Sequence, residues 1–127
     1  MRLLLDTHAL LWWLGNKSRL GRVATARIED VHTDVFVSAA TAWEIAVKQG
    51  SGKLDVPFDV AFAIAEQGFI PLAITVEHGV AAGALPRHHA DPFDRMLVAQ
   101  AREEGLWIVT SDEAIRRYDV PSLDASL

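Results

Sequence analysis

Short runs of apolar residues alternate along the chain with longer stretches in which apolar positions recur at helical spacing. The runs predict four β-strands, at residues 2–6, 35–38, 69–74 and 106–110. The stretches between them predict helices at residues 9–14, 22–30, 39–49, 76–84 and 112–118, and two more from Pro57 to Gly68 and from Pro92 to Gly105. Because the strands are almost continuously apolar, both faces of their sheet should be covered. The alternation therefore predicts a three-layer α/β fold, with a mostly parallel central sheet and helices on both faces.

Four acidic residues fall where predicted strands pass into helices. Asp6 ends the first strand, and Asp112 follows the last strand closely. Glu44 lies in the helix after the second strand, and Asp94 lies in the first turn of the helix that begins at Pro92. In a parallel sheet, the carboxyl ends of strands and the amino ends of crossover helices share one edge, where ligands bind. We therefore expect the four side chains to converge.

Such a cluster of acids would need a counter-charge. Two carboxylates about 4 Å apart repel by roughly 4 kcal/mol at an effective dielectric near 20. Four of them would stay ionised only around a cation, and an all-oxygen site favours Mg²⁺ or Mn²⁺. The pattern thus indicates a metal-dependent phosphoryl-transfer enzyme.

The first two acids also have structural explanations. Asp6 could cap the following helix, although Thr7 is equally able to cap it and would leave Asp6 free. Glu44 follows Thr41 at the spacing of a capping box and precedes Lys48 at the spacing of a favourable i,i+4 pair. Taken alone, Glu44 fits a structural role.

Asp94 and Asp112 also have structural explanations. Asp91 is the natural N-cap of its helix, with Pro92 in the first position, and Asp94 complements the helix dipole. Asp112 lies in the first turn after Ser111, the expected cap of the last helix. None of these structural roles predicts that acids from four elements share one edge of the sheet, and this favours an enzyme. Because each acid taken singly can be explained structurally, a non-catalytic binding protein also remains open on pattern alone.

Size and composition indicate one domain spanning residues 1–127. Half of the 127 residues are apolar, and the chain shows no internal repeat, low-complexity tract or Pro/Gly-rich linker. It has no cysteine, which excludes disulfides and thiolate metal sites and fits a reducing cytoplasm. The apolar run after Met1 is interrupted at Asp6 before it reaches the length of a signal peptide, and no run is long enough for a membrane span. We expect a soluble, cytoplasmic protein without a membrane segment.

Charge and isolated polar groups change this picture little. The net charge of −5 argues against bulk attraction to nucleic acid, although a bound cation would reverse the field of an acidic site. Arg87 and Arg95 flank one candidate acid and could contact phosphates or simply face solvent. His88 and His89 stand just before Asp91 in the loop that leads to the next helix. A single pair of histidines is weak evidence for a zinc site, so a contact with phosphate is the better interpretation.

The tryptophans raise the question of an exposed aromatic surface. Trp12 and Trp13 lie about 100° apart on their helix, so they cannot both enter one core. One of them, or Trp43, is a candidate for packing at a protein interface or stacking on a base. Trp107 lies within a predicted strand and is expected in the core.

Missing motifs narrow the alternatives. The chain contains no G-x-G-x-x-G, G-x-x-x-x-G-K-[ST] or G-x-S-x-G, which argues against dinucleotide, P-loop and serine-hydrolase chemistry. A receiver-like phosphoacceptor module needs a lysine after a late strand, whereas Lys53 is the last lysine. A phosphatase with Asp6 as nucleophile needs a second acid two residues on, where His8 stands. A receiver-like or otherwise non-catalytic regulatory binding module is the main alternative to a metal-dependent phosphoryl-transfer enzyme.

Four blocks of the sequence resemble those of PIN-domain ribonucleases, and more narrowly the VapC-type toxins of type II toxin–antitoxin pairs. In chain order they read DTHALLWWL, SAATAWEIAVKQGSGKL, HHADPFDRMLVAQA and IVTSD. They follow one another in the family's order between Asp6 and Asp112, and the most specific is the D-P-F-D-R-x-L-x-A-Q-A block from Asp91 to Ala101. The stretch from Asp55 to Pro86 matches by length and position only.

The resemblance implies a PIN fold and a metal-dependent endoribonuclease that binds Mg²⁺ or Mn²⁺. The family's acids fall on Asp6, Glu44, Asp94 and Asp112, of which Asp6, Asp94 and Asp112 would hold the metal. Residues that would support the site are Thr110, Asp91, His89 and Arg95. The resemblance also implies an RNA substrate, a homodimer and a cognate, VapB-like antitoxin protein.

Overall fold

The computed structural model describes residues 1–127, which form one five-stranded sheet, seven α-helices and one short 3-10 helix, η1. The strands are β1 (Arg2–Leu5), β2 (Asp34–Ser38), β3 (Ile70–Leu72), β4 (Trp107–Thr110) and β5 (Ser122–Asp124). The helices are α1 (Thr7–Gly15), η1 (Lys17–Arg19), α2 (Arg22–Glu29), α3 (Ala39–Gly50), α4 (Val60–Glu66), α5 (Val76–Ala84), α6 (Pro92–Glu104) and α7 (Glu113–Arg116).

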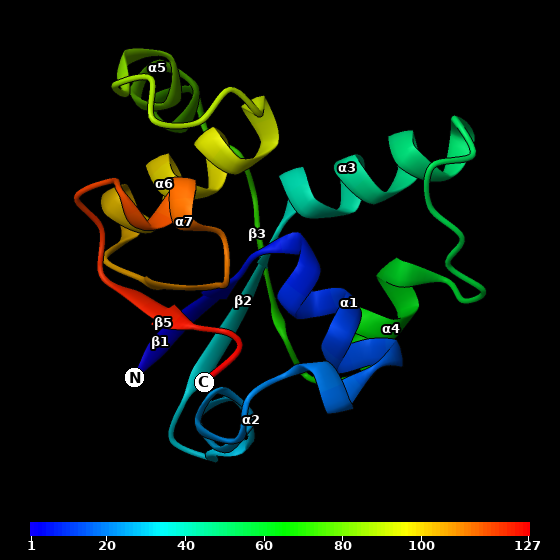
Figure 1. Ribbon diagram of the computed structural model, residues 1–127. Helices are drawn as coiled ribbons and strands as arrows, with labels where there is room; N and C mark the ends of the chain where they lie inside the picture. Colours follow the sequence, from blue (N-terminus) through cyan, green and yellow to red (C-terminus); the bar gives the residue numbers. More distant parts are fainter.

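All neighbouring strands run parallel, in the order β3-β2-β1-β4-β5. β1 lies at the centre, where Leu4 pairs with Phe36 of β2 and Ile108 of β4. The chain passes from β1 into α1 and from β2 into α3 at the same edge of the sheet (Figure 1). The predicted α/β fold and parallel sheet are confirmed. The sheet has one strand more than predicted, namely β5. This strand could not be predicted because its three partly buried residues contain no apolar run.

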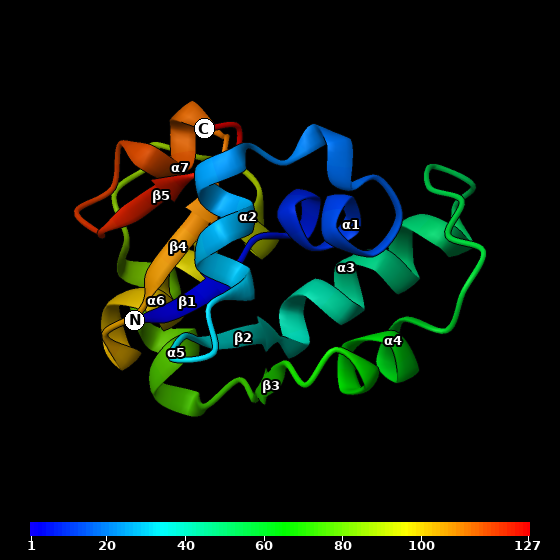
Figure 2. The same cartoon turned by 90° about the horizontal axis from the view of Figure 1, so that it is seen from below.

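Two hydrophobic cores cover the two faces of the sheet, since successive side chains of a strand point in opposite directions. Leu3 and Leu5 pack with α1, α2 and α4, whereas Leu4 packs with α5, α6 and α7. Figure 2 shows α1 and α2 on one side of the sheet and α5 and α6 on the other. α3 contributes to both cores, through Ile45 on the first side and Ala40 on the second. Both layers therefore fix the orientation of α3.

The caps of two helices differ from the sequence prediction. Asp6 is the N-cap of α1, because its carboxylate accepts a hydrogen bond from the Ala9 N–H at 2.8 Å. The expectation that Thr7 would leave Asp6 free of capping is wrong. α7 is capped by Asp112 rather than Ser111, and it spans only Glu113–Arg116. Acids at both positions accept backbone N–H groups that a helix start leaves unpaired.

The starts of α3 and α4 also differ. Ser38 caps α3, so the expected capping box between Thr41 and Glu44 is absent, and the Thr41 hydroxyl is buried without a partner. α4 begins after Asp59 rather than at Pro57. Phe62 of that helix is 65% exposed.

Trp107 is not a core residue, contrary to the prediction, since 41% of it is exposed. It is the first residue of β4 and lies at the amino end of the strand, where the helical layers do not cover it fully. Trp13 is buried and donates its indole N–H to Gln67, while Trp12 is only partly buried. None of the helices combines the length and apolar composition that crossing a bilayer requires.

Candidate active site

Acidic side chains from four elements meet at the carboxyl edge of the sheet. Asp6 directly follows β1, and Asp112 follows β4 after one intervening residue. Glu44 lies in α3, and Asp94 lies in the first turn of α6. The negative charges of Glu44 and Asp6 act on the pKa of Asp94, and that of Asp112 acts on the pKa of Asp6. The structure therefore brings together all four acids singled out in the sequence.

His89 joins two of these acids. Its Nε2 atom lies 2.8 Å from Asp112 Oδ2 and 3.1 Å from Asp94 Oδ2. Its Nδ1 atom accepts a hydrogen bond from the Asp91 backbone N–H at 3.0 Å. A neutral imidazole carries one ring hydrogen, so this acceptor role places the hydrogen on Nε2, facing both carboxylates. His89 thus directs its ring N–H toward the carboxylates of both Asp94 and Asp112.

Asp6 is the most central acid and is only 4% exposed. Burial raises its pKa, and hydrogen bonds from the Thr110 hydroxyl and the Ala9 N–H oppose that rise. The Thr110 hydroxyl oxygen also accepts a hydrogen bond from the Asp112 N–H at 3.0 Å. One hydroxyl therefore connects Asp6 to the backbone of Asp112.

Asp94 and Asp112 differ in their affinity for a proton. Burial raises the pKa of Asp94 from 3.8 to about 7, and the charges of Asp91 and Glu44 add to this rise. Burial also acts to raise the pKa of Asp112, but the hydrogen bonds from His89 and backbone N–H groups outweigh it and lower the pKa. Burial and the neighbouring carboxylates therefore both disfavour the charged form of Asp94.

Glu44 is 3% exposed, and both of its carboxylate oxygens are paired. The Thr7 hydroxyl donates to Oε1, and Lys48 Nζ contacts Oε2, each at 2.5 Å. The i,i+4 pair with Lys48 was predicted from the sequence. The Thr7 contact was not, because it depends on how α1 packs against α3. Glu44 is consequently held in one position at the rim of the acid cluster.

Asp91 and Tyr118 build the loop before α6. Asp91 caps this helix by accepting hydrogen bonds from the N–H groups of Phe93 and Asp94, at 2.8 and 3.4 Å. The Tyr118 hydroxyl accepts a hydrogen bond from the His89 N–H at 3.0 Å. No motif in the sequence pointed to Tyr118, which reaches the loop from beyond α7.

Arg95 stabilises the end of α5. Its guanidinium donates to three backbone carbonyls at 2.9 to 3.1 Å, those of Ala82, Leu85 and Pro86. These bonds satisfy carbonyls that a helix end leaves unpaired. The Arg95 side chain is therefore engaged with backbone rather than directed at the acids.

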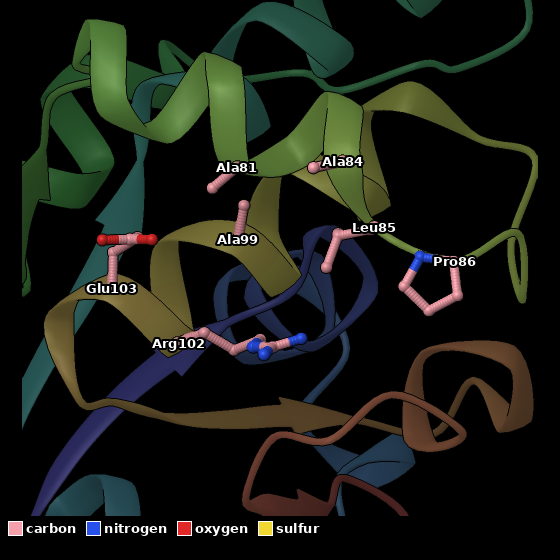
Figure 3. A pocket seen from close by; sticks show the side chains of 7 residues that line it. All are labelled: Ala81, Ala84, Leu85, Pro86, Ala99, Arg102 and Glu103. Atoms are coloured by element: carbon pink, nitrogen blue, oxygen red, sulfur yellow. The ribbon is translucent and has the colours of Figure 1, made fainter.

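Two hollows beside α6 are not lined by any of the four acids. One of about 380 Å³ lies between α5 and α6 (Figure 3) and is lined by Ala81, Ala84, Leu85, Pro86, Ala99, Arg102 and Glu103. Another of about 730 Å³ borders the acids at His89 and includes the exposed side chains of Arg87 and His88. Small-molecule sites are usually concave and apolar, so an open acidic edge fits a large substrate better.

The model of the PIN domain matches residues 3–121, a span that includes all four acids. The chain belongs to the PIN-domain family. This PIN domain is 33% identical to Ribonuclease VapC22 of Mycobacterium tuberculosis over 122 residues, which are 93% of this chain and 92% of that protein. The prediction of a VapC-type PIN ribonuclease is thereby confirmed. PIN-family nucleases use divalent metal ions, and an acidic cluster suited to one is present here.

Solved structures share the fold of this PIN domain. VapBC2 from Rickettsia felis, bound to a DNA fragment from its promoter, has a TM-score of 0.73 and 12% identity, with 97% of this chain and 98% of that chain covered. A toxin–antitoxin complex from Klebsiella pneumoniae has a TM-score of 0.66 and 15% identity, with 97% of both chains covered. At these identities the likeness concerns the fold alone.

Proposed function

We propose that this PIN domain is the toxin of a toxin–antitoxin pair and hydrolyses RNA phosphodiester bonds with Mg²⁺ or Mn²⁺ at Asp6, Glu44, Asp94 and Asp112. The observation that carries the proposal is the convergence of these acids at one edge, with the pKa of Asp94 raised to about 7. A cluster of acids held together in this way is suited to binding a cation, which supports the proposal.

Asp6, Asp94 and Asp112 would hold the ion. Carboxylate oxygens of Asp94 and Asp112, together with a ring nitrogen of His89, lie within 4.8 Å of one another, so these two acids are close enough to share one ion. His89 presents an N–H and not a lone pair to the carboxylates, so the ligand set consists of oxygens, which suits Mg²⁺ or Mn²⁺. When bound, the ion would activate a water molecule and neutralise charge on the phosphate.

The remaining residues would orient a water molecule or keep the acids in place. Asp112 has the most exposed side chain of the four acids, 38% against 16% for Asp94 and 4% for Glu44, so an incoming water would reach it most readily and be oriented by it. Glu44 has both oxygens engaged and acts through its fixed charge. Thr110 keeps Asp6 and the Asp112 backbone aligned.

The same proposal covers the partners of the protein. We infer that residues 1–127 form one PIN domain that acts in the cytoplasm as a homodimer and is inhibited by a cognate, VapB-like antitoxin. The single sheet and the family match from residue 3 to 121 support one domain. The toxin–antitoxin complex with the same fold supports the antitoxin partner.

The test is metal-dependent cleavage of RNA by purified protein. Wild-type protein should cut RNA with Mg²⁺ or Mn²⁺ and stop when EDTA is added. Asp6→Asn and Asp94→Asn should lose at least about 100-fold in rate, as expected when transition-state charge stabilisation is lost, while circular dichroism shows them folded. Asp55→Asn, a change at an exposed acid away from the cluster, is the matched control and should cut normally. Equal rates for Asp94→Asn and wild type would refute the assigned roles.

A further inference from the structure

A network of buried hydrogen bonds joins α6 to the ends of two strands. Gln100 of α6 is 0% exposed, although the residues buried beside it in the helix are apolar. Its Oε1 atom accepts a hydrogen bond from the Ser38 hydroxyl at 2.5 Å, and its Nε2 atom donates to the Ala73 carbonyl at 3.3 Å. Ser38 ends β2, and Ala73 directly follows β3. One side chain of α6 therefore bonds to both of these junctions.

A buried histidine fixes the orientation of the Gln100 amide. The His78 Nδ1 atom accepts a hydrogen bond from the Thr75 N–H at 3.0 Å, so it carries no hydrogen of its own. The Gln100 Nε2 atom faces the same nitrogen at 3.4 Å. Because that nitrogen can only accept, the amide turns its NH₂ group toward His78 and its oxygen toward Ser38. The Ser38 hydroxyl is therefore the donor to Gln100.

The polar groups of this network tolerate little movement. Ser38, His78 and Gln100 are each at most 2% exposed, so a displaced group could not bond to water instead. A buried polar group that loses its hydrogen bond is strongly disfavoured, whereas apolar side chains can slide past one another at smaller cost. The network therefore favours a single placement of α6 against β2 and β3.

The Ser38 hydroxyl extends the network into α3. Its oxygen also accepts the Ala40 N–H at 3.0 Å, which makes Ser38 the N-cap of this helix. Glu44 follows Ser38 by six residues in α3, and Asp94 precedes Gln100 by six residues in α6. At a rise of about 1.5 Å per residue, about 9 Å of helix separates each acid from the bond between Ser38 and Gln100. A change at this bond therefore tilts one helix against the other and moves Glu44 relative to Asp94.

A second contact between α3 and α6 lies at the surface. The ring centroids of Trp43 and Phe93 are 5.0 Å apart. Trp43 is 62% exposed, so these rings can shift against each other without leaving a buried polar group unpaired. The buried bond of Gln100 is therefore the stricter of the two contacts.

We propose that Gln100 is a positioning residue for the hydrolysis of RNA. Its bond to Ser38 holds α3 against α6 and thereby keeps Glu44 at the distance from Asp94 that binding of the metal ion requires. This inference rests on the proposed function and assigns a role at the same site to a residue outside the acid cluster. Gln100 is buried and makes no hydrogen bond to the four acids, so it acts through the two helices.

Calorimetric titration with Mn²⁺ tests this role on folded protein, well below the unfolding temperature. Gln100→Met keeps the length of the side chain and removes both of its hydrogen bonds. Its dissociation constant for Mn²⁺ should rise about 10-fold, the lower end for outer partners of a metal site, while the number of binding sites stays that of wild type. In RNA cleavage at a fixed Mg²⁺ concentration, kcat should fall and KM should stay unchanged, because the substitution lies away from the surface that RNA meets.

Ser38→Gly breaks the same bond from the other helix, and it carries the test if Gln100→Met does not fold. Glycine is tolerated at an N-cap, so α3 should still form. We expect the same rise of about 10-fold for Ser38→Gly and for the double variant, since one bond is lost only once. A rise of about 100-fold in the double variant would show two independent effects and would overturn the proposal.

Ile28→Val is the matched control. Ile28 of α2 is buried in the core on the opposite face of the sheet from α6, and its shortening leaves a cavity without breaking the bond between α3 and α6. This variant should lower the unfolding temperature and leave the affinity for Mn²⁺ unchanged. A merely structural role for Gln100 would give the same pattern, with less folded protein, fewer binding sites and unchanged affinity in the sites that remain. That result for Gln100→Met would overturn the proposal.

Failure of this inference is distinguishable from failure of the proposed function. If wild-type protein binds Mn²⁺ and cuts RNA, and both single variants bind Mn²⁺ as tightly, only the role of Gln100 is wrong. If wild-type protein neither binds Mn²⁺ nor cuts RNA, the proposed function fails, and the role of Gln100 fails with it.

Discussion

Replacing Asp94 by asparagine should stabilise the metal-free protein at alkaline pH. The folded state raises the pKa of Asp94 from 3.8 to about 7. Between those two pH values the folded protein holds a proton that the unfolded chain releases, so the free energy of unfolding falls as pH rises through this window. Asparagine has nearly the same shape but never becomes charged.

The size of the effect follows from the rise in pKa of about 3, at 1.36 kcal/mol for each pKa unit, which sets a ceiling of about 4 kcal/mol. Neighbouring acids titrate together with Asp94, so the part that asparagine recovers is roughly 2–4 kcal/mol at pH 8. At pH 4.5 most of the penalty is absent, and the difference should shrink to about 1 kcal/mol.

Urea unfolding in EDTA, followed by circular dichroism at pH 4.5 and pH 8, measures these differences. Adding Mg²⁺ at pH 8 should stabilise the wild type and not Asp94→Asn, by about 2.7 kcal/mol at a concentration 100 times the dissociation constant. Asp55→Asn should stay within about 0.5 kcal/mol of wild type at both pH values. If metal-free Asp94→Asn is no more stable than wild type at pH 8, Asp94 is not a destabilising charge and the reasoning fails.

Three further predictions concern stability and can be checked by thermal or urea unfolding. Thr7→Val removes the hydroxyl that donates to buried Glu44 and should cost about 1–3 kcal/mol, and a cost under 0.5 would contradict that contact. Thr41→Val removes a buried hydroxyl without a partner, so it should be neutral or stabilising by up to about 1 kcal/mol, and a clear loss would reveal a missed partner. Gly21→Ala places a Cβ 2.1 Å from the backbone of Leu127 and should destabilise by at least about 1–3 kcal/mol, whereas an unchanged midpoint would mean that this segment moves aside freely.

The sequence predicted the parts of the fold that local patterns determine. The parallel sheet, α5 with its Thr75 cap and α6 between Asp91 and Gly105 all agree with the structure. Apolar runs and capping residues carry these features within a few positions of the chain. β5 was not predicted, because its three partly buried residues form no apolar run.

The sequence predicted which acids meet at the edge of the sheet, but it did not predict the hydrogen bonds that hold them there. Placement of Asp6 and Asp112 at strand ends follows from the topology of a parallel sheet. The bond between Thr7 and Glu44 joins α1 to α3 and needs their packing angle, which no spacing reveals. Trp107 was expected inside because strands of this type are covered on both faces, but the first residue of β4 extends beyond that cover.

The position of β4 in the sheet has a consequence during synthesis on the ribosome. β4 is a direct neighbour of β1, the central strand, yet Ile108 pairs with Leu4 from almost the whole length of the chain away. A nascent polypeptide that has emerged only as far as Gly105 has one side of its central strand unpaired and lacks Asp112. Translation therefore has to proceed past Asp112 before the four acids can come together at one edge of the sheet.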